Sequence, residues 1–294
     1  MSNQTISGGA KGRRYIALAV VAFLVIAFGI IAYKTVNKPG ITRIGVLQLV
    51  SHPSLDHIRE GIIREMKVHE GELETKFEFD VQNAQGDTKV VKTIADKFSA
   101  GGYDLIIPIT TPAAQAVANA SKNIPIVFGA VTDPVAAGIV KSLQNPGGNV
   151  TGVSDLWPIE KQISLALQLV PTARTIGTVY NPGEANSQTI IKLIREACIK
   201  HNVNLQETTV AQGNEVLAAT RALVGKADVI FTAADSTVGA AYESVLKVAR
   251  ENRIPIFAGD GDSVERGAIG TLGLDYANVG RLTGELAVKI LKGA

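Results

Sequence analysis

A carboxylate-binding site is indicated by a pair of threonines that follows an apolar segment. Thr110 and Thr111 come directly after the apolar run 105–109, which is typical of a parallel strand covered on both faces, and Pro112 and Ala113 follow them. Proline is common in the first turn of a helix, so we expect a helix to begin here with Thr111 as its N-cap. Hydroxyls, free backbone N–H groups and the absence of bulky side chains would together suit an anion.

Four carboxylates that follow other apolar segments could bind an ammonium group. They are Asp133, Glu184, Asp235 and Asp260. Donors on one side of a site and acceptors on the other suit a zwitterion, and a free amino acid is a natural candidate. A purely structural interpretation also stays open, because Asp and Asn at junctions between strands and helices often serve only as caps.

The residue patterns expected of a catalyst or a metal site are missing from the sequence. His52 follows the first apolar segment, but no serine or cysteine nucleophile motif accompanies it. The single cysteine, Cys198, stands in a helical pattern and is expected to be buried. Asp260-Gly261-Asp262 lacks the spacing of a calcium loop. We therefore expect no enzymatic activity, no cofactor and no metal.

The segments that must position these residues occur twice in the same order. Apolar strands are predicted at 43–46, 103–107 and 124–128, and again at 175–179, 227–231 and 254–257, with helical stretches between them. Such a repeat predicts an α/β protein with two similar lobes, each a doubly wound parallel sheet, joined by a hinge. Ligands of such sheets bind outside the carboxyl ends of the strands, so a cleft between the lobes is the expected site.

Turn signals and periodicity set the expected boundaries. We expect the N-terminal lobe at 43–152, the C-terminal lobe at 153–270, and a helix in 271–294 that returns to the N-terminal lobe. A helix is expected at 159–169, and the glycine-rich segment 266–273 is expected to be a second crossing between the lobes. Trp157, at the first crossing, could pack in the hinge or form part of a ligand wall. Because two-lobed plans usually carry a further strand, we expect the C-terminal end to be truncated.

The N-terminus predicts a membrane segment. Residues 15–33 carry no charge and follow Lys11, Arg13 and Arg14, and 19 residues in a helix just cross the hydrocarbon layer. We favour an uncleaved signal anchor at 15–33 with a cytoplasmic tail at 1–14 and a tether at 34–42. A cleaved signal peptide is the alternative, which would leave the protein secreted or periplasmic.

Several short sequence motifs, taken together, resemble those of one protein family. They include Ser51-His52-Pro53-Ser54-Leu55-Asp56, Thr111-Pro112-Ala113-Ala114-Gln115, Val131-Thr132-Asp133-Pro134 and Asn181-Pro182-Gly183-Glu184-Ala185-Asn186-Ser187. Because these motifs occur in the family's order over residues 43–294, the chain resembles the bacterial ABC-transporter substrate-binding proteins of the tryptophan/tyrosine type. The resemblance implies the type I periplasmic-binding-protein fold and a small solute, in relatives an aromatic amino acid, delivered to a membrane permease.

By the same resemblance, ten positions would contact the ligand. They are Ser54, Thr110, Thr111, Ala113, Asp133, Asn181, Glu184, Asn186, Asp235 and Asp260. The chain departs from the family pattern at Asp235-Ser236-Thr237, where the family usually has Asp-Asn-Thr, so Ser236 does not supply the amide of that pattern.

We therefore expect an extracytoplasmic solute-binding protein, held at the cell membrane by residues 15–33. Its partners would be a small zwitterionic ligand and an ABC permease with its ATPase. With 29 basic and 27 acidic residues the formal charge is +2, so nucleic acid is not an expected partner, and we expect a monomer. A membrane-anchored module that senses a ligand and signals to a membrane partner is the alternative, and an enzyme on a doubly wound scaffold is the more distant one.

Overall fold

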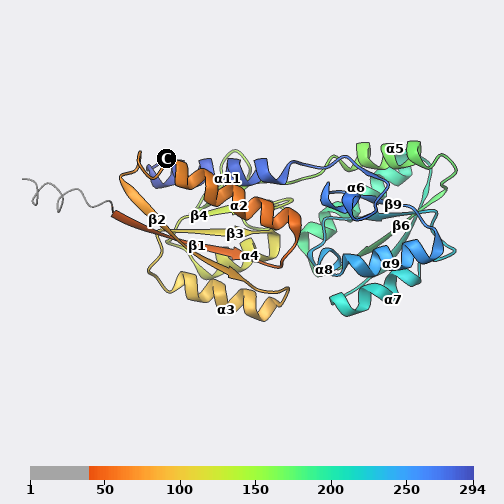
Figure 1. Ribbon diagram of the computed structural model, residues 1–294, viewed down its shortest axis with the longest axis horizontal. Helices are drawn as coiled ribbons and strands as arrows, with labels where there is room; N and C mark the ends of the chain where they lie inside the picture. Colours follow the sequence, from red (N-terminus) through yellow and green to blue (C-terminus); the bar gives the residue numbers. More distant parts are fainter. Residues whose placement is uncertain (1–39) are drawn as a thin grey trace, which may run out of the picture. The chain divides into compact units, whose positions relative to one another are not determined.

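The computed structural model describes residues 40–294 as two five-stranded sheets with helices on both faces of each (Figure 1). Among these residues, no helix combines the length and the apolar character that a membrane crossing needs. The predicted tail 1–14 and anchor 15–33, with the first residues of the tether, lie outside the described residues.

The first lobe is built on the sheet of order β2-β1-β3-β4-β5. Its strands are β1 (Gly40–Gln48), β2 (Thr75–Asn83), β3 (Leu105–Ile109), β4 (Ile126–Gly129) and β5 (Val150–Val153). Side chains of β3 alternate between the two faces of the sheet. Leu105 and Ile107 pack under α2 (Pro53–Val68) and α11 (Tyr276–Leu291). Ile106 packs on the other face, under α3 (Thr88–Ser99) and α4 (Thr111–Ala120).

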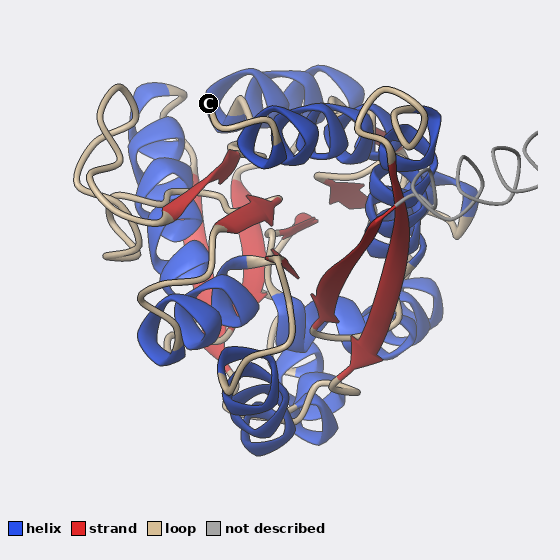
Figure 2. Ribbon diagram, turned by 90° about the vertical axis from the view of Figure 1, so that its left-hand side faces the viewer, coloured by secondary structure: helices blue, strands red, loops and turns tan. Residues whose placement is uncertain are grey.

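The second lobe repeats this plan with a fully parallel sheet of order β10-β9-β8-β6-β7. Its strands are β6 (Thr175–Tyr180), β7 (Asn204–Thr209), β8 (Val229–Thr232), β9 (Ile256–Ala258) and β10 (Gly270–Thr271). One face packs against α5 (Ile159–Leu169) and α6 (Ala185–Lys200), the other against α7 (Val216–Arg221) and α9 (Tyr242–Asn252). The short segments η1 (Gly213–Glu215), α8 (Ser236–Ala240) and α10 (Asp262–Glu265) complete the lobe. Figure 2 shows the strands in red between helices in blue.

The chain passes between the sheets twice, after Val153 and after Thr271. After the second passage, α11 lies along α2 in the core of the first lobe (Figure 1). Glycines permit this close approach, because a Cβ on Gly280 would lie 2.3 Å from the carbonyl oxygen of Ile58. The last helix is therefore part of the first lobe, although it is the last element in the sequence.

Two expected elements are confirmed, one strand was missed, and one expected crossing begins later in the chain. The strand at 105–109 and the helix at 159–169 occur as predicted. The edge strand β7 was not predicted, because its polar sequence Asn-Leu-Gln-Glu-Thr-Thr gives no apolar run. The second crossing, expected at 266–273, begins later in that segment, because Gly270 and Thr271 still pair with β9 and the passage follows them.

Candidate functional site

A cavity of about 100 Å³ is lined by both lobes at the carboxyl ends of their strands. A single buried water needs roughly 10–15 Å³, so the cavity can hold a larger guest. The first lobe contributes Ser54, Thr110 and Thr111, and the second contributes Asn186, Asp235 and Asp260. Asp155 and Trp157 from the first crossing and Tyr276 at the start of α11 also line it.

The lining is acidic. Three carboxylates face the cavity, Asp155, Asp235 and Asp260, whereas no lysine or arginine of residues 40–294 lines it. A low-dielectric space with this composition favours a guest that carries a positive charge or hydrogen-bond donors.

The first-lobe wall contains two buried hydroxyls without a partner. The Oγ1 atoms of Thr110 and Thr111 have no hydrogen-bond partner, and the two residues are 8% and 2% exposed. Thr110, not Thr111, is the N-cap of α4, and its side chain makes no capping bond, so the expected cap is wrong. Thr110 also has φ 87°, a costly conformation for a β-branched residue. Backbone strain and unpaired hydroxyls therefore occur together at one helix start in the cavity wall.

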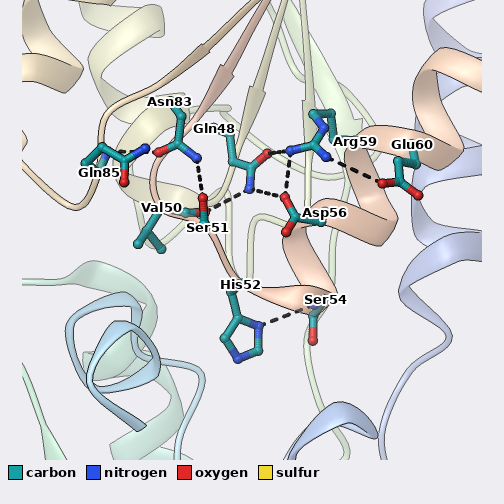
Figure 3. A network of polar contacts seen from close by, with 10 residues as sticks. All are labelled: Gln48, Val50, Ser51, His52, Ser54, Asp56, Arg59, Glu60, Asn83 and Gln85. Carbon is teal, nitrogen blue, oxygen red and sulfur yellow. Dashed lines mark hydrogen bonds and ion pairs between the residues drawn. The ribbon is translucent and has the colours of Figure 1, made fainter. Parts of the chain in front are cut away.

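The loop before α2 is fixed by side-chain hydrogen bonds (Figure 3). The buried Gln48 amide donates to the Val50 carbonyl at 2.8 Å and to Asp56 at 2.9 Å. Arg59 Nη1 in turn donates to Asp56 at 2.6 Å and to Gln48 at 2.8 Å. These bonds fix the β1–α2 loop, which carries His52, and the first turn of α2, which carries Ser54, beside the cavity.

His52 and Ser54 contact the opposite lobe rather than forming a catalytic pair. His52 Nδ1 accepts from the Ser54 backbone N–H at 3.3 Å and so caps α2. Burial lowers the pKa of His52, against the opposing effect of Asp260, which favours the neutral ring. Ser54 Oγ donates to Asp262 Oδ2 at 2.6 Å, and Arg266 Nη1 lies 3.4 Å from His52 Nε2. The two lobes are thus joined directly at this edge of the cavity.

Asp235 and Asn186 form the second-lobe wall. Asp235 accepts from the Asn181 N–H at 2.6 Å, from Ser187 Oγ at 2.7 Å and from the Val238 N–H at 2.8 Å. Burial, with a smaller contribution from the nearby Glu184, raises the pKa of Asp235 to about 6. Asn186 donates to the Ala234 carbonyl at 2.7 Å, but its Oδ1 is buried without a partner. This wall therefore offers acceptors to a guest.

The wall at the crossings is aromatic, with one buried acid. Trp157 Nε1 donates to the Tyr276 hydroxyl oxygen at 3.0 Å. Asp155 accepts from Thr132 Oγ1 at 3.1 Å, and burial raises its pKa to about 6. Neither Asp155 nor Tyr276 was among the ten expected contacts. The position of Asp155 just after β5 was the signal that could have found it.

Six of the ten expected positions line the cavity: Ser54, Thr110, Thr111, Asn186, Asp235 and Asp260. The other four, Ala113, Asp133, Asn181 and Glu184, are not among its lining residues.

Local structure accounts for these four. Ala113 is buried in the first-lobe core, and Asp133 accepts from the backbone of Val135 and Ala136. Asn181 accepts from the Gly183 N–H at 2.8 Å, which closes a turn. Glu184 accepts from the N–H groups of Ser236 and Thr237 at 2.9 and 3.0 Å, in the first turn of α8, whose N-cap is Asp235.

Comparison with known proteins gives three close similarities. A tyrosine-binding protein of Clostridioides difficile (strain R20291) is 43% identical over 250 residues, covering 85% of this chain and 72% of that protein. An ABC domain from Streptococcus pneumonia, whose structure was solved in complex with L-Trp, is 36% identical in sequence. The TM-score is 0.83, and the match covers 87% of this chain and 86% of that one.

A third relative differs more in structure. It is a ligand-free, open substrate binding protein with adhesive properties from Clostridium difficile, 41% identical, with a TM-score of 0.62 and 86% of each chain covered. At similar identity the TM-score is lower against the open structure, so the present chain is closer to the L-Trp complex in overall arrangement.

The family model described as ABC transporter substrate binding protein matches residues 43–294. This match agrees with the two-lobed fold and with the acidic cavity at the strand ends. The chain therefore belongs to the ABC transporter substrate binding protein family.

Proposed function

We propose that the cavity binds a free amino acid by its two charged ends. The observation that carries the proposal is the set of unpaired buried atoms on opposite lobes, Thr110 Oγ1 and Thr111 Oγ1 in one and Asn186 Oδ1 in the other. Buried polar atoms normally have partners, so three unpaired atoms on residues that line one cavity support a ligand that supplies those partners. The ligand carboxylate would bind the threonine hydroxyls and the α4 N–H groups. The ammonium group would bind Asp235 and Asn186.

An aromatic side chain fits the remaining wall. Trp157 and Tyr276 line the cavity and are 5% and 8% exposed, and aromatic rings pack favourably against one another. The relatives are named for tyrosine or contain L-Trp. We therefore propose that this chain binds an aromatic amino acid.

Binding to both lobes also suits delivery to a transporter. A ligand shifts an open–closed equilibrium only if it binds one state more tightly, and contacts with both lobes do so for the closed state. We propose that a permease with its ATPase recognises this closed form outside the cytoplasmic membrane. The anchor at 15–33 and a monomeric state are part of the same proposal, and the chain acts as a binding protein rather than an enzyme.

Calorimetric titration of the purified chain with each of the twenty amino acids tests the proposal. We expect saturable binding of aromatic amino acids and weak or no binding of acidic and basic ones. Asp235→Ala should abolish the binding while the unfolding midpoint stays measurable, and Asp87→Asn, at the distant N-cap of α3, should bind as the parent does. A folded chain that binds no amino acid would contradict the proposal. Co-purification with a permease, rather than with a signalling protein, would separate transport from the sensing alternative.

A further inference from the structure

Asp155 is a buried acid in the cavity wall with neutral polar neighbours. It lies between β5 and α5, is 7% exposed and lines the cavity. Its carboxylate accepts from Thr132 Oγ1 at 3.1 Å, and the nearby Tyr276 hydroxyl partly offsets the rise in its pKa that burial causes. Within residues 40–294 no lysine, arginine or histidine forms an ion pair with it. A carboxylate offers about four acceptor positions, so Asp155 can accept from a guest as well.

The surroundings of Asp155 are rigid. Tyr276 is held by the Trp157 indole N–H, which donates to its oxygen at 3.0 Å. Trp157 in turn lies on Gly259, where a Cβ would come within 1.6 Å of the indole ring. Asp155 therefore keeps a fixed place beside two aromatic rings, and a preorganised acceptor discriminates between guests more sharply than a mobile one.

The charged ends of an amino acid have other partners in the proposed function. The ammonium group is assigned to Asp235 and Asn186, and the carboxylate to Thr110 and Thr111. The ligand side chain is then the part left for the aromatic wall. The amino acids that appear with the relatives, tyrosine and L-Trp, both carry a hydrogen-bond donor on an aromatic ring.

We propose that Asp155 accepts a hydrogen bond from the ring O–H or N–H of the bound amino acid, so that the site selects tyrosine and tryptophan over phenylalanine. This inference rests on the proposed function, because it assigns a part of the same ligand. Phenylalanine would bury the carboxylate without its last donor, and sites built around a ligand hydroxyl reject analogues that lack it.

Titration calorimetry with L-tyrosine, L-tryptophan and L-phenylalanine tests the inference on the full chain. The parent should bind phenylalanine roughly 10- to 100-fold more weakly than tyrosine, as expected for a lost hydrogen bond to a charged group. In Asp155→Ala the two affinities should differ by less than about threefold, mainly through weaker tyrosine binding. Asp155→Asn keeps an acceptor oxygen and should retain part of the preference. Asp87→Asn should retain all of it.

Two results would overturn the inference while leaving the proposed function intact. The first is a parent chain that binds phenylalanine as tightly as tyrosine. The second is an Asp155→Ala variant that loses tyrosine and phenylalanine binding by the same factor, as an ammonium partner or a purely structural residue would. If Asp155→Ala does not fold, the parent ratio and Asp155→Asn decide. Failure to bind any amino acid would instead overturn the proposed function, and this inference with it.

Discussion

Replacing Thr111 by valine should stabilise the ligand-free chain and weaken ligand binding. The Thr111 hydroxyl is buried without a partner, and valine has nearly the same shape without the hydroxyl. A buried polar group without a partner costs roughly 1–3 kcal/mol. Because the residue lines a cavity that can admit water, we take the lower end, about 1 kcal/mol. This corresponds to a rise of roughly 2–3 °C in the unfolding midpoint.

The same substitution should weaken amino-acid binding by roughly 10- to 100-fold, because a hydrogen bond to a charged carboxylate contributes about 1.5–3 kcal/mol. Thermal melts of the ligand-free chain and calorimetric titrations with L-tryptophan measure the two effects separately. Opposite signs for stability and affinity are the signature of a hydroxyl kept for a ligand rather than for the fold.

Thr178→Val is the matched control. Thr178 Oγ1 is also buried without a partner, in β6 of the second lobe, but it does not line the cavity. The Thr178→Val substitution should raise the unfolding midpoint, as Thr111→Val does, and leave the affinity for L-tryptophan unchanged. An unchanged affinity in Thr111→Val, or an equal loss of affinity in Thr178→Val, would show that the Thr111 hydroxyl does not bind the ligand.

Three further predictions concern protonation, helix packing and closure. Burial raises the pKa of Asp155 from 3.8 to about 6, so the stability held by its protonated form is present below about pH 4 and lost as the pH rises through 6. Thermal melts between pH 4 and pH 7 should therefore show a smaller decrease of the unfolding midpoint with rising pH for Asp155→Asn than for the parent. Equal decreases in the two chains would contradict a raised pKa at Asp155. Gly280→Ala should lower the free energy of unfolding by roughly 1–3 kcal/mol, because the added Cβ forces α11 away from α2. Gly71→Ala is the control: a Cβ at Gly71 would meet no heavy atom within 4 Å, so denaturant unfolding should give nearly the parent value. Ser54→Ala removes the 2.6 Å hydrogen bond to Asp262, which joins the two lobes. The radius of gyration of the ligand-free chain should increase in X-ray scattering, and the affinity for the ligand should fall by up to about tenfold. No change in either quantity would show that this bond does not favour the closed form.

The buried strands could be predicted from the sequence because buried parallel strands give continuous apolar runs. Leu105–Ile109 is such a run, and its bounds agree with the prediction. The edge strand β7 has partly exposed polar residues, so nothing local distinguishes it from a loop. Its place in the sheet depends on pairing with β6, which is a long-range contact.

The site could be predicted only as far as the strand-end rule reaches. The rule brings Thr110 and Asp235 to the cavity, but it cannot tell which carboxylates are already used by the backbone. Glu184 is one such case, because the N–H groups that donate to it lie more than fifty residues away at the start of α8. Asp155 follows β5 closely, and the same rule would have reached it had 150–153 been treated as a strand of the first sheet.

A crystal structure of the chain with bound L-tryptophan would show directly how the two ends of the ligand are held. The ligand carboxylate should lie about 3 Å from the hydroxyls of Thr110 and Thr111, and the ammonium group at a similar distance from Asp235 and from Asn186 Oδ1. A ligand bound with these ends reversed, or bound outside the cavity between the lobes, would contradict this arrangement.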